Sequence, residues 1–279
     1  MFKLFKRKPD PRENLRSVLG EQRLPSFPNL LWNVLEKLRD PEASMGEIGR
    51  LLSLDPGLSV KLLRTVNCAG TGVRKQVNSV SHAVVLLGRR QVESMVLAVA
   101  VQDALPAHQT GAFSSADFWK TAAHRAVTAH SLARIVEPAV ADLSFTAALL
   151  QDMALPLLTL HRAHDYAPVL EAWHGGDGEL EELEEQALGF HHAQVGDWMS
   201  ETWTFPADLR AAIGDHHGGD GAPAPVQLVS QIRNADDADG QEFLLEGMRG
   251  RYGFNPDRTL RVMAAGEEQV RELSKLLAA

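Results

Sequence analysis

The sequence predicts an all-α protein, and three observations support that class. Apolar residues recur at helical spacing along almost the whole chain. No convincing run of alternating β-branched residues, the pattern of a half-buried strand, interrupts them. Asp-Pro pairs and glycines divide the apolar segments into lengths typical of helices. With 279 residues, the chain is long enough to form two compact helical lobes.

A basic tail and a lead-in helix are expected over residues 1–19, followed by a first lobe over residues 20–105. The tail combines cations with Phe2, Leu4 and Phe5, but its apolar part is too short and interrupted for the core of a signal peptide. A solvated flexible tail is the favoured interpretation, and weak contact with anionic lipid is the alternative.

The first lobe is predicted to contain a series of short helices. Leucines and a valine recur at helical spacing between residues 30 and 38, and Asp40-Pro41 then ends this helix. Residues 44–70 divide into two short helices at Asp55-Pro56, because the residue before proline is pushed out of the helical region. Asp55 is therefore expected to cap the second of them, and Gly88 to end a further short helix before a longer apolar one.

The second lobe is expected over residues 106–240, with a C-terminal helical extension over residues 241–279. A connector leads into a long helix that ends near residue 136, for which Ser114 or Ser115 is a suitable cap. The apolar run LLQDMALPLL follows. The acidic helix GELEELEEQALG then carries five glutamates, interpreted most simply as its solvated face, with its leucines facing the core.

Charge and composition exclude several classes of protein. The formal net charge of −8 disfavours direct binding to DNA or RNA. No apolar run was expected to approach the roughly 20 residues that a membrane-spanning helix needs, so no membrane span is predicted. Cys68 is the only cysteine, which rules out an internal disulfide and fits a reducing compartment, so a cytoplasmic location is expected. Cys68 itself is expected to be a buried apolar side chain and not a nucleophile.

Several stretches occur in an order that is more specific than any one of them. In the first lobe these are LPSFPNLLWNVLEKLRDPEASMGEIGRLLSLDPGLSVKLLRTVNCAG and VNSVSHAVVLLGRRQVESMVLAVAV. In the second lobe they are FWKTAAHRAVTAHSLAR, FTAALLQDMALPLL and LGFHHAQVGDWMSETWTFPADLRAAIGDHH. Together they resemble the HDOD domain, a bacterial HD-related output domain that is kin to the HD and HD-GYP phosphohydrolases. The resemblance implies a two-lobed helical HDOD fold with an HD-like second lobe.

That resemblance also implies a site in which histidines and carboxylates bind one or two divalent ions, which activate water and neutralise charge on a phosphate. Two implied ligands are replaced in this chain. Thr121 stands where metal-binding relatives carry the first histidine, and Gln151 replaces the histidine of the His-Asp pair. Neither a hydroxyl nor an amide supplies the strong donation of an imidazole. His124 could compensate only if its helix shifted, because it lies about one turn further along.

Other implied ligands are retained. They are Asp152, His192, His216, His217 and Asp236, with Asp237 as an uncertain substitute for the last. These residues could form a three- or four-ligand site for Fe, Mn, Ni, Zn or Mg, although the expectation is that no cofactor is resident. The alternative is that the carboxylate caps a helix and that the histidines beside glycines bond backbone groups. The chain continues APAPVQL where HD-GYP proteins carry Gly-Tyr-Pro, so that hydrolase signature is missing.

Three functions were weighed. The leading hypothesis is a non-catalytic signalling protein. Its two lobes would bind a signalling protein or a nucleotide-like small ligand in the groove between them. The hypothesis depends on the loss of the metal-ligating histidines at the positions of Thr121 and Gln151. The competing hypothesis is a metal-dependent phosphohydrolase with a rearranged site that acts on a nucleotide or another phosphate ester. The third is binding of a cyclic nucleotide without hydrolysis, with the remaining histidines and Arg89 or Arg90 as anion contacts. A cap of the preceding helix or a surface position is the simpler role for these arginines. The sequence leaves the signal, the partner and the oligomeric state open.

Overall fold

The computed structural model describes residues 11–20, 24–67, 76–234 and 237–277, and nearly all of their regular structure is helical. This confirms the predicted all-α class. The exception is a short antiparallel ribbon of β1 (Gln109–Thr110) and β2 (Phe113–Ser114), within the segment predicted as a connector. Most of the basic tail, together with Cys68 and Asp236, lies outside the described residues.

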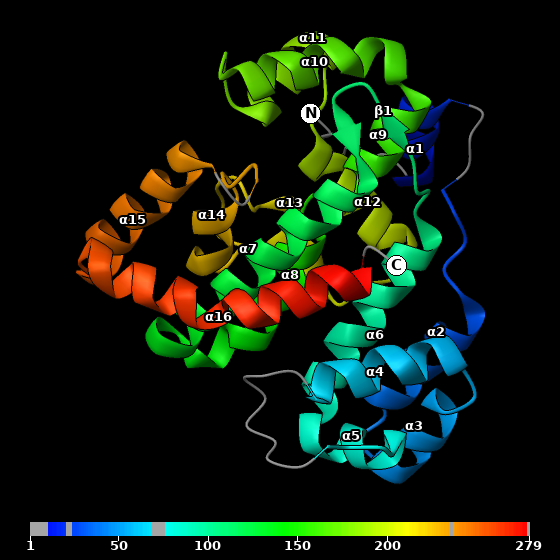
Figure 1. Cartoon of the computed structure of the whole chain (residues 1–279). Coiled ribbons are helices and arrows are strands. Elements are labelled where there is room, and N and C mark those ends of the chain that lie inside the picture. Colours follow the sequence, from blue (N-terminus) through cyan, green and yellow to red (C-terminus); the bar gives the residue numbers. More distant parts are fainter. Residues whose placement is uncertain (1–10, 21–23, 68–75, 235–236, 278–279) are drawn as a thin grey trace, which may run out of the picture.

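The helices of the first lobe gather at one end of the molecule (Figure 1). They are α2 (Asn29–Arg39), α3 (Met45–Leu52), α4 (Pro56–Asn67), α5 (Val80–Leu87) and α6 (Arg89–Ala104). Asp55 caps α4 as predicted, since its Oδ1 accepts a hydrogen bond from the Leu58 N–H at 2.9 Å. Gly88, with a φ of 78°, ends α5 and lets the chain turn directly into α6.

The second lobe is built around α7 (Ser115–Val136), which packs against α8, α14 and α16. Ser114 caps α7, as predicted, by accepting a hydrogen bond from the Asp117 N–H at 3.3 Å. The elements that follow are η1 (Pro138–Val140), α8 (Ala141–Leu150), α9 (Leu155–His161), α10 (Ala163–Gly175), α11 (Leu180–Leu188), α12 (His192–Thr202), α13 (Ala207–Gly214), α14 (Ala224–Val229), α15 (Ala238–Tyr252) and α16 (Pro256–Leu277). The lead-in helix α1 (Pro11–Leu19) packs against α9 and α12 of this lobe.

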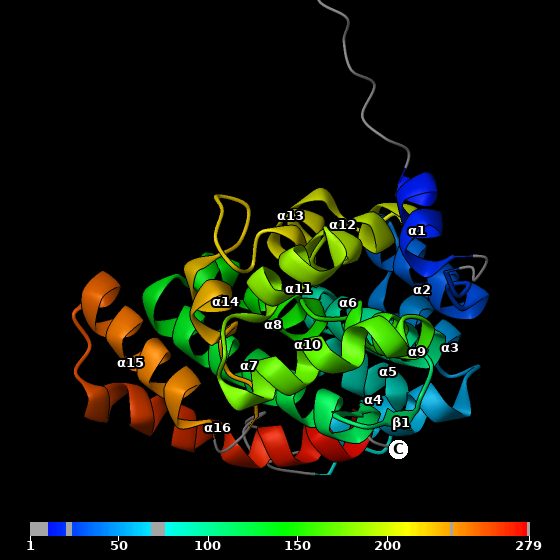
Figure 2. The ribbon, with the colours of Figure 1, turned by 90° about the horizontal axis from the view of Figure 1, so that it is seen from above.

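The last helix, α16, connects the two lobes. It runs along α7 and reaches α4 of the first lobe, and Figure 2 shows it with α15 along one edge of the molecule. Gly266 permits the close approach to α7, because a Cβ at that position would lie 2.8 Å from Val127 Cγ1. At the far end of α16, the Leu277 carbonyl accepts a hydrogen bond from Gln102 Nε2 at 2.6 Å, which holds α16 against α6.

Among the described residues, one stretch, Pro138–His161, is long and apolar enough by composition to cross a membrane. The expectation that no apolar run approaches this length was therefore wrong. In the structure the stretch is divided among η1, α8 and α9, and 83% of its most apolar window is buried. Packing in the core explains its composition, since Leu149, Leu150 and Leu157 are at most 1% exposed.

Arg89 has a structural role at the C-terminal end of α2. Its Nη1 donates to the carbonyl oxygens of Leu38 at 2.6 Å and Asp40 at 2.8 Å, and its Nη2 donates to that of Ala43 at 2.5 Å. The Leu38 carbonyl lies in the last turn of α2, where intrahelical donors are lacking, and the Asp40 and Ala43 carbonyls lie in the connection to α3, so Arg89 joins the end of α2 to this connection. These contacts give Arg89 a structural role and not an anion contact, but at the end of α2 and not at the end of the preceding helix α5, where a cap was expected.

Replacement of Arg89 with methionine is expected to lower the free energy of unfolding by about 1–3 kcal/mol, because partly buried carbonyls lose their donor. Arg90→Met is the matched control, since Arg90 is adjacent and exposed; a change below about 0.5 kcal/mol is expected there. Urea unfolding followed by circular dichroism measures both values. Equal losses in the two variants would contradict the role assigned to Arg89.

Candidate functional site

Four of the residues singled out in the sequence converge on one point in the second lobe. Asp152, His192, His216 and His217 each offer a donor atom, and these atoms lie within 4.8 Å of one another. His192 Nε2 is 3.2 Å from His216 Nε2 and 2.8 Å from His217 Nε2. Asp152 Oδ1 lies 3.2 Å from His216 Nε2 and 3.4 Å from His192 Nε2. The side chains of all four are at least 86% buried, so the cluster is an interior feature and not a surface patch.

Local structure explains why these residues meet. Asp152 lies in the turn of residues 151–154 that follows the buried end of α8, while His192 begins α12 and the His216–His217 pair follows α13. Gly196 on α12 allows α12 and α13 to approach closely, because a Cβ there would lie 3.1 Å from Ile213 Cγ2. The close packing of these two helices brings the three imidazoles together beside the turn.

A shell of acceptors holds the outer ring nitrogens of the histidines. The buried Glu184 accepts from His192 Nδ1 at 2.6 Å and from the His192 backbone N–H at 2.8 Å, and it also accepts from the hydroxyl of Tyr166. His216 Nδ1 donates to the Ile213 carbonyl at 2.7 Å. With their Nδ1 atoms engaged in this way, His192 and His216 direct Nε2 toward the shared point, which is the arrangement that metal-binding histidines adopt.

Charge within the cluster is unevenly distributed. Burial opposes the charged form of His192, but Glu184 and Asp152 outweigh it and raise the pKa of His192 to about 10. Burial lowers the pKa of His216. Burial, together with the neighbouring His216 and His192, also lowers the pKa of His217. In the absence of a metal, the cluster therefore holds its positive charge as a proton on His192.

The donor set fits a divalent metal ion. Asp152 Oδ1 is buried, and the ring nitrogens of His216 and His192 lie 3.2 and 3.4 Å from it, within ion-pair distance. A divalent cation at this point would take the place of the proton on His192 and pair with the carboxylate of Asp152. Three imidazoles and one carboxylate suit Zn, Fe, Mn or Ni better than Mg, which prefers oxygen ligands.

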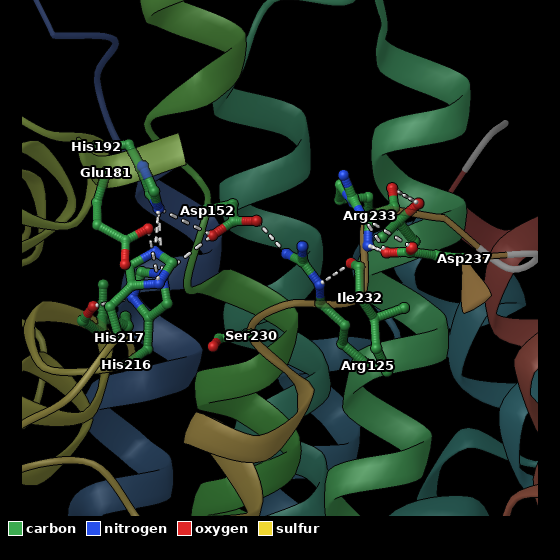
Figure 3. Close-up of polar contacts among 12 residues, drawn as sticks. Arg125, Asp152, Glu181, His192, His216, His217, Ser230, Ile232, Arg233 and Asp237 are labelled. Atoms are coloured by element: carbon green, nitrogen blue, oxygen red, sulfur yellow. Dashed lines mark hydrogen bonds and ion pairs between the residues drawn. The ribbon is translucent and has the colours of Figure 1, made fainter. Parts of the chain in front are cut away.

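The other oxygen of Asp152 is paired with Arg125 of α7. Arg125 Nη1 donates to Asp152 Oδ2, and Arg125 Nε donates to the Ile232 carbonyl at 2.7 Å. Figure 3 shows Asp152 between the histidines on one side and Arg125 on the other. Burial alone would raise the pKa of Asp152, but Arg125 and the rings of His192 and His216 hold it well below its usual range.

A cavity of about 350 Å³ opens on the Arg125 side of Asp152. Its walls include Thr121, Arg125, Trp173 and Arg233. The hydroxyl of Thr121 donates to the Arg233 carbonyl at 3.4 Å, so Thr121 borders this cavity and is not one of the four clustered residues. The position that resembles the first metal ligand is therefore occupied by a structural hydroxyl.

The remaining candidate ligands have other surroundings. His124 and Asp237 are not among the four clustered residues. Asp237 caps α15, where its side chain accepts from the Gly240 N–H at 3.3 Å and from the Arg233 N–H at 2.7 Å. These bonds assign Asp237 a structural role in place of the ligand role considered for it.

Glu184 was missed in the sequence, where all five glutamates of the acidic helix were interpreted as its solvated face. That interpretation is wrong for Glu184, which is fully buried. The spacing in the sequence does indicate that Glu184 is buried. Glu184 lies four residues after Leu180 and four before Leu188, and therefore on the same face of the helix as these leucines. A carboxylate in an apolar stripe of a helix implies a buried partner.

Gln151 is buried at 1% exposure, and neither atom of its amide has a hydrogen-bond partner among the described residues. Gln151→Met keeps the length of the side chain and removes the unpaired polar atoms, so it is expected to raise the free energy of unfolding by about 1–2 kcal/mol. Chemical denaturation measures this change. A loss of stability of similar size would indicate that the amide has a bound partner in solution.

A two-lobed all-α fold with a histidine–aspartate cluster in its second lobe defines an HD-type helical domain. The chain belongs to the HDOD family, whose domain model matches residues 24–218. An uncharacterized protein of Treponema pallidum (strain Nichols) is 23% identical over 216 residues, which cover 76% of this chain. The chain spans about two fifths of that relative, since the match covers 41% of it.

Solved structures agree with the assignment of the fold. A protein from Shewanella amazonensis SB2B, provisionally named a phosphohydrolase, is 22% identical and aligns with a TM-score of 0.75 over 94% of this chain and 97% of that one. A protein from Marinobacter aquaeolei VT8, provisionally named a signal transduction protein, is 18% identical and aligns with a TM-score of 0.72 over 96% of this chain and 66% of that one. At these identities the likeness establishes the fold alone.

Proposed function

We propose that this HDOD protein is a non-catalytic regulatory protein in which the cluster of Asp152, His192, His216 and His217 holds one divalent metal ion as a structural centre. The observation that carries the proposal is the asymmetry around Asp152. Three imidazoles gather on the side of Oδ1, whereas among the described residues Oδ2 is bound by the guanidinium of Arg125.

Tetrahedral Zn²⁺ with four protein ligands would have no open position for water. Catalytic zinc sites keep such a position, with three protein ligands and a water, whereas structural sites are closed by four. When bound, the metal would supply a cation that joins the turn after α8, the start of α12 and the loop after α13. The chain's own residues would hold it rigidly, because Glu184 and the Ile213 carbonyl orient two of the three imidazoles.

Hydrolysis of phosphate esters at paired metals needs two cations about 3.5–4 Å apart that clamp the attacking and leaving oxygens. The losses at Thr121 and Gln151 remove two donors that the family resemblance implies. Arg125 then neutralises the carboxylate oxygen that a second cation would use. These features favour a regulatory role over turnover.

We propose further that this regulatory protein binds a small ligand at the junction between its lobes. A second cavity, of about 230 Å³, lies there, with Met95 and Val99 of α6, Phe145 and Leu149 of α8, and Leu273 of α16 in its walls. Arg134, Asp142 and Glu272 also line it, so it suits part of a small ligand that carries polar groups better than a helix of a partner protein. The name of the Marinobacter protein adds support for a role in signalling.

The second candidate remains a metal-dependent phosphohydrolase with a rearranged site. The cavity of about 350 Å³ beside Asp152 favours it, because a substrate there would approach both Asp152 and Arg125. With tetrahedral Zn²⁺, turnover would require one protein ligand to leave the metal and admit water, whereas Mn, Fe or Ni could bind water beside the four protein ligands.

Metal analysis with phosphatase assays tests the two candidates. The purified full chain, reconstituted with Zn²⁺ or Mn²⁺ and freed of excess metal, is expected to retain one equivalent and to hydrolyse neither 4-nitrophenyl phosphate nor bis(4-nitrophenyl) phosphate. His217→Ala is expected to lose the metal, and His191→Ala, which alters a neighbouring histidine outside the cluster, to retain it. Metal-dependent turnover that disappears in His217→Ala would establish the phosphohydrolase, and a metal-free protein would refute the structural centre.

A further inference from the structure

We infer that Arg125 is a built-in competitor of the metal: its fixed guanidinium occupies Asp152 Oδ2, limits the centre to one ion and weakens the binding of that ion. This inference rests on the proposed function, because it takes the cluster to be a metal centre. It assigns to Arg125 a role in determining metal stoichiometry and affinity.

The guanidinium is held in place independently of the carboxylate. Arg125 is 3% exposed, and its Nε is bound to the Ile232 carbonyl at 2.7 Å while its Nη1 reaches Asp152. The backbone after α14 therefore fixes the cation, and Asp152 has no freedom to turn both oxygens toward the histidines without breaking this pair. In a buried site, two bonds of this kind define the position of a planar guanidinium.

Asp152 must share one negative charge between two cations. A metal at the histidine cluster contacts the carboxylate that Arg125 already neutralises, so the metal gains less from Asp152 than it would from a free carboxylate. The metal and the guanidinium also repel each other through a poorly screened interior. Both effects weaken metal binding.

The far side of Asp152 offers little to a second metal. Thr121 directs its hydroxyl to the Arg233 carbonyl, and the Arg233 side chain adds another positive charge, which is paired with Asp237 at 3.2 Å. Two arginines and a hydroxyl that is already engaged do not form a site for a divalent cation. The stoichiometry is therefore set by residues outside the cluster.

A purely orienting role for Arg125 predicts the opposite change in affinity. Groups that only orient a ligand strengthen metal binding, and their loss typically weakens it by about 10–100-fold. A competing cation weakens metal binding, and its removal strengthens it. The sign of the change therefore separates the two roles.

The test compares Zn²⁺ affinity, measured by competition with a chromophoric chelator, in the wild-type full chain and in Arg125→Gln and Arg125→Lys. Glutamine can keep a hydrogen bond to Asp152 without the charge, and lysine keeps the charge. Arg125→Gln is expected to bind Zn²⁺ at least about tenfold more tightly, with Arg125→Lys within about threefold of wild type. Arg210→Gln, which breaks an unrelated pair with Asp197, is the control and is expected to leave affinity unchanged.

Unchanged or weaker binding in Arg125→Gln would overturn the inference while leaving the metal centre intact. If that variant fails to fold, the Zn²⁺ stoichiometry of the wild-type full chain remains as the test. Two equivalents of Zn²⁺ in the wild-type protein would also overturn it. Absence of Zn²⁺ binding in every variant, wild type included, would instead refute the proposed function and the inference together.

Discussion

Glu184→Ala is expected to lower the free energy of unfolding by about 3–5 kcal/mol. The carboxylate of Glu184 is fully buried and accepts hydrogen bonds from the backbone and ring of His192 and from the Tyr166 hydroxyl. Alanine would leave these donors without an acceptor. It would also remove the main charge that stabilises protonated His192 in the metal-free protein. Metal affinity is expected to fall by about 10–100-fold, because Glu184 orients the His192 ring.

Glu185→Ala is the matched control for this prediction. Glu185 is the next residue of the same helix, but it is exposed, so its replacement is expected to change stability by less than about 0.5 kcal/mol. Guanidinium unfolding in the presence of a chelator measures stability, and chelator competition measures affinity. A loss below about 1 kcal/mol in Glu184→Ala would show that Glu184 does not support the cluster.

Local signals in the sequence were sufficient to predict much of the fold. The caps at Asp55 and Ser114 and the helix end at Gly88 were predicted from residue type and position, because each depends on interactions within a few residues. The β1–β2 ribbon was not predicted. Its strands have two residues each, too few for a period of two to be recognised.

The candidate site was predictable only in part. The family resemblance named Asp152, His192, His216 and His217, but their convergence depends on the packing of α8, α12 and α13, which no spacing in the sequence determines. On α7, the sequence indicated only His124 as a replacement ligand. The residue that contacts the site is Arg125, which lies four positions after Thr121 and therefore on the same face of the helix.

The pairing of Arg125 with Asp152 also makes these two residues strongly interdependent in stability. Each side chain is a charged group in the interior, with exposures of 3% and 6%, and each is the other's partner. In the metal-free protein, Asp152→Leu is expected to lower the free energy of unfolding by about 3–5 kcal/mol, because it leaves the guanidinium of Arg125 buried without a counter-ion. Arg125→Met is expected to lower the free energy of unfolding by a similar amount, because it leaves the carboxylate of Asp152 buried without the guanidinium of Arg125.

The double variant Asp152→Leu with Arg125→Met is expected to be more stable than either single variant, because no unpaired charge of this pair stays in the core and two apolar side chains fill a similar volume. Urea unfolding of the four proteins in a chelator forms a double-mutant cycle, with an expected coupling of at least about 2 kcal/mol. The protonated His192 opposes full recovery, since it also loses the carboxylate of Asp152. If the losses of stability in the two single variants simply add in the double variant, solvent or another group already pairs with the guanidinium of Arg125. The assignment of Asp152 Oδ2 as its partner would then be wrong.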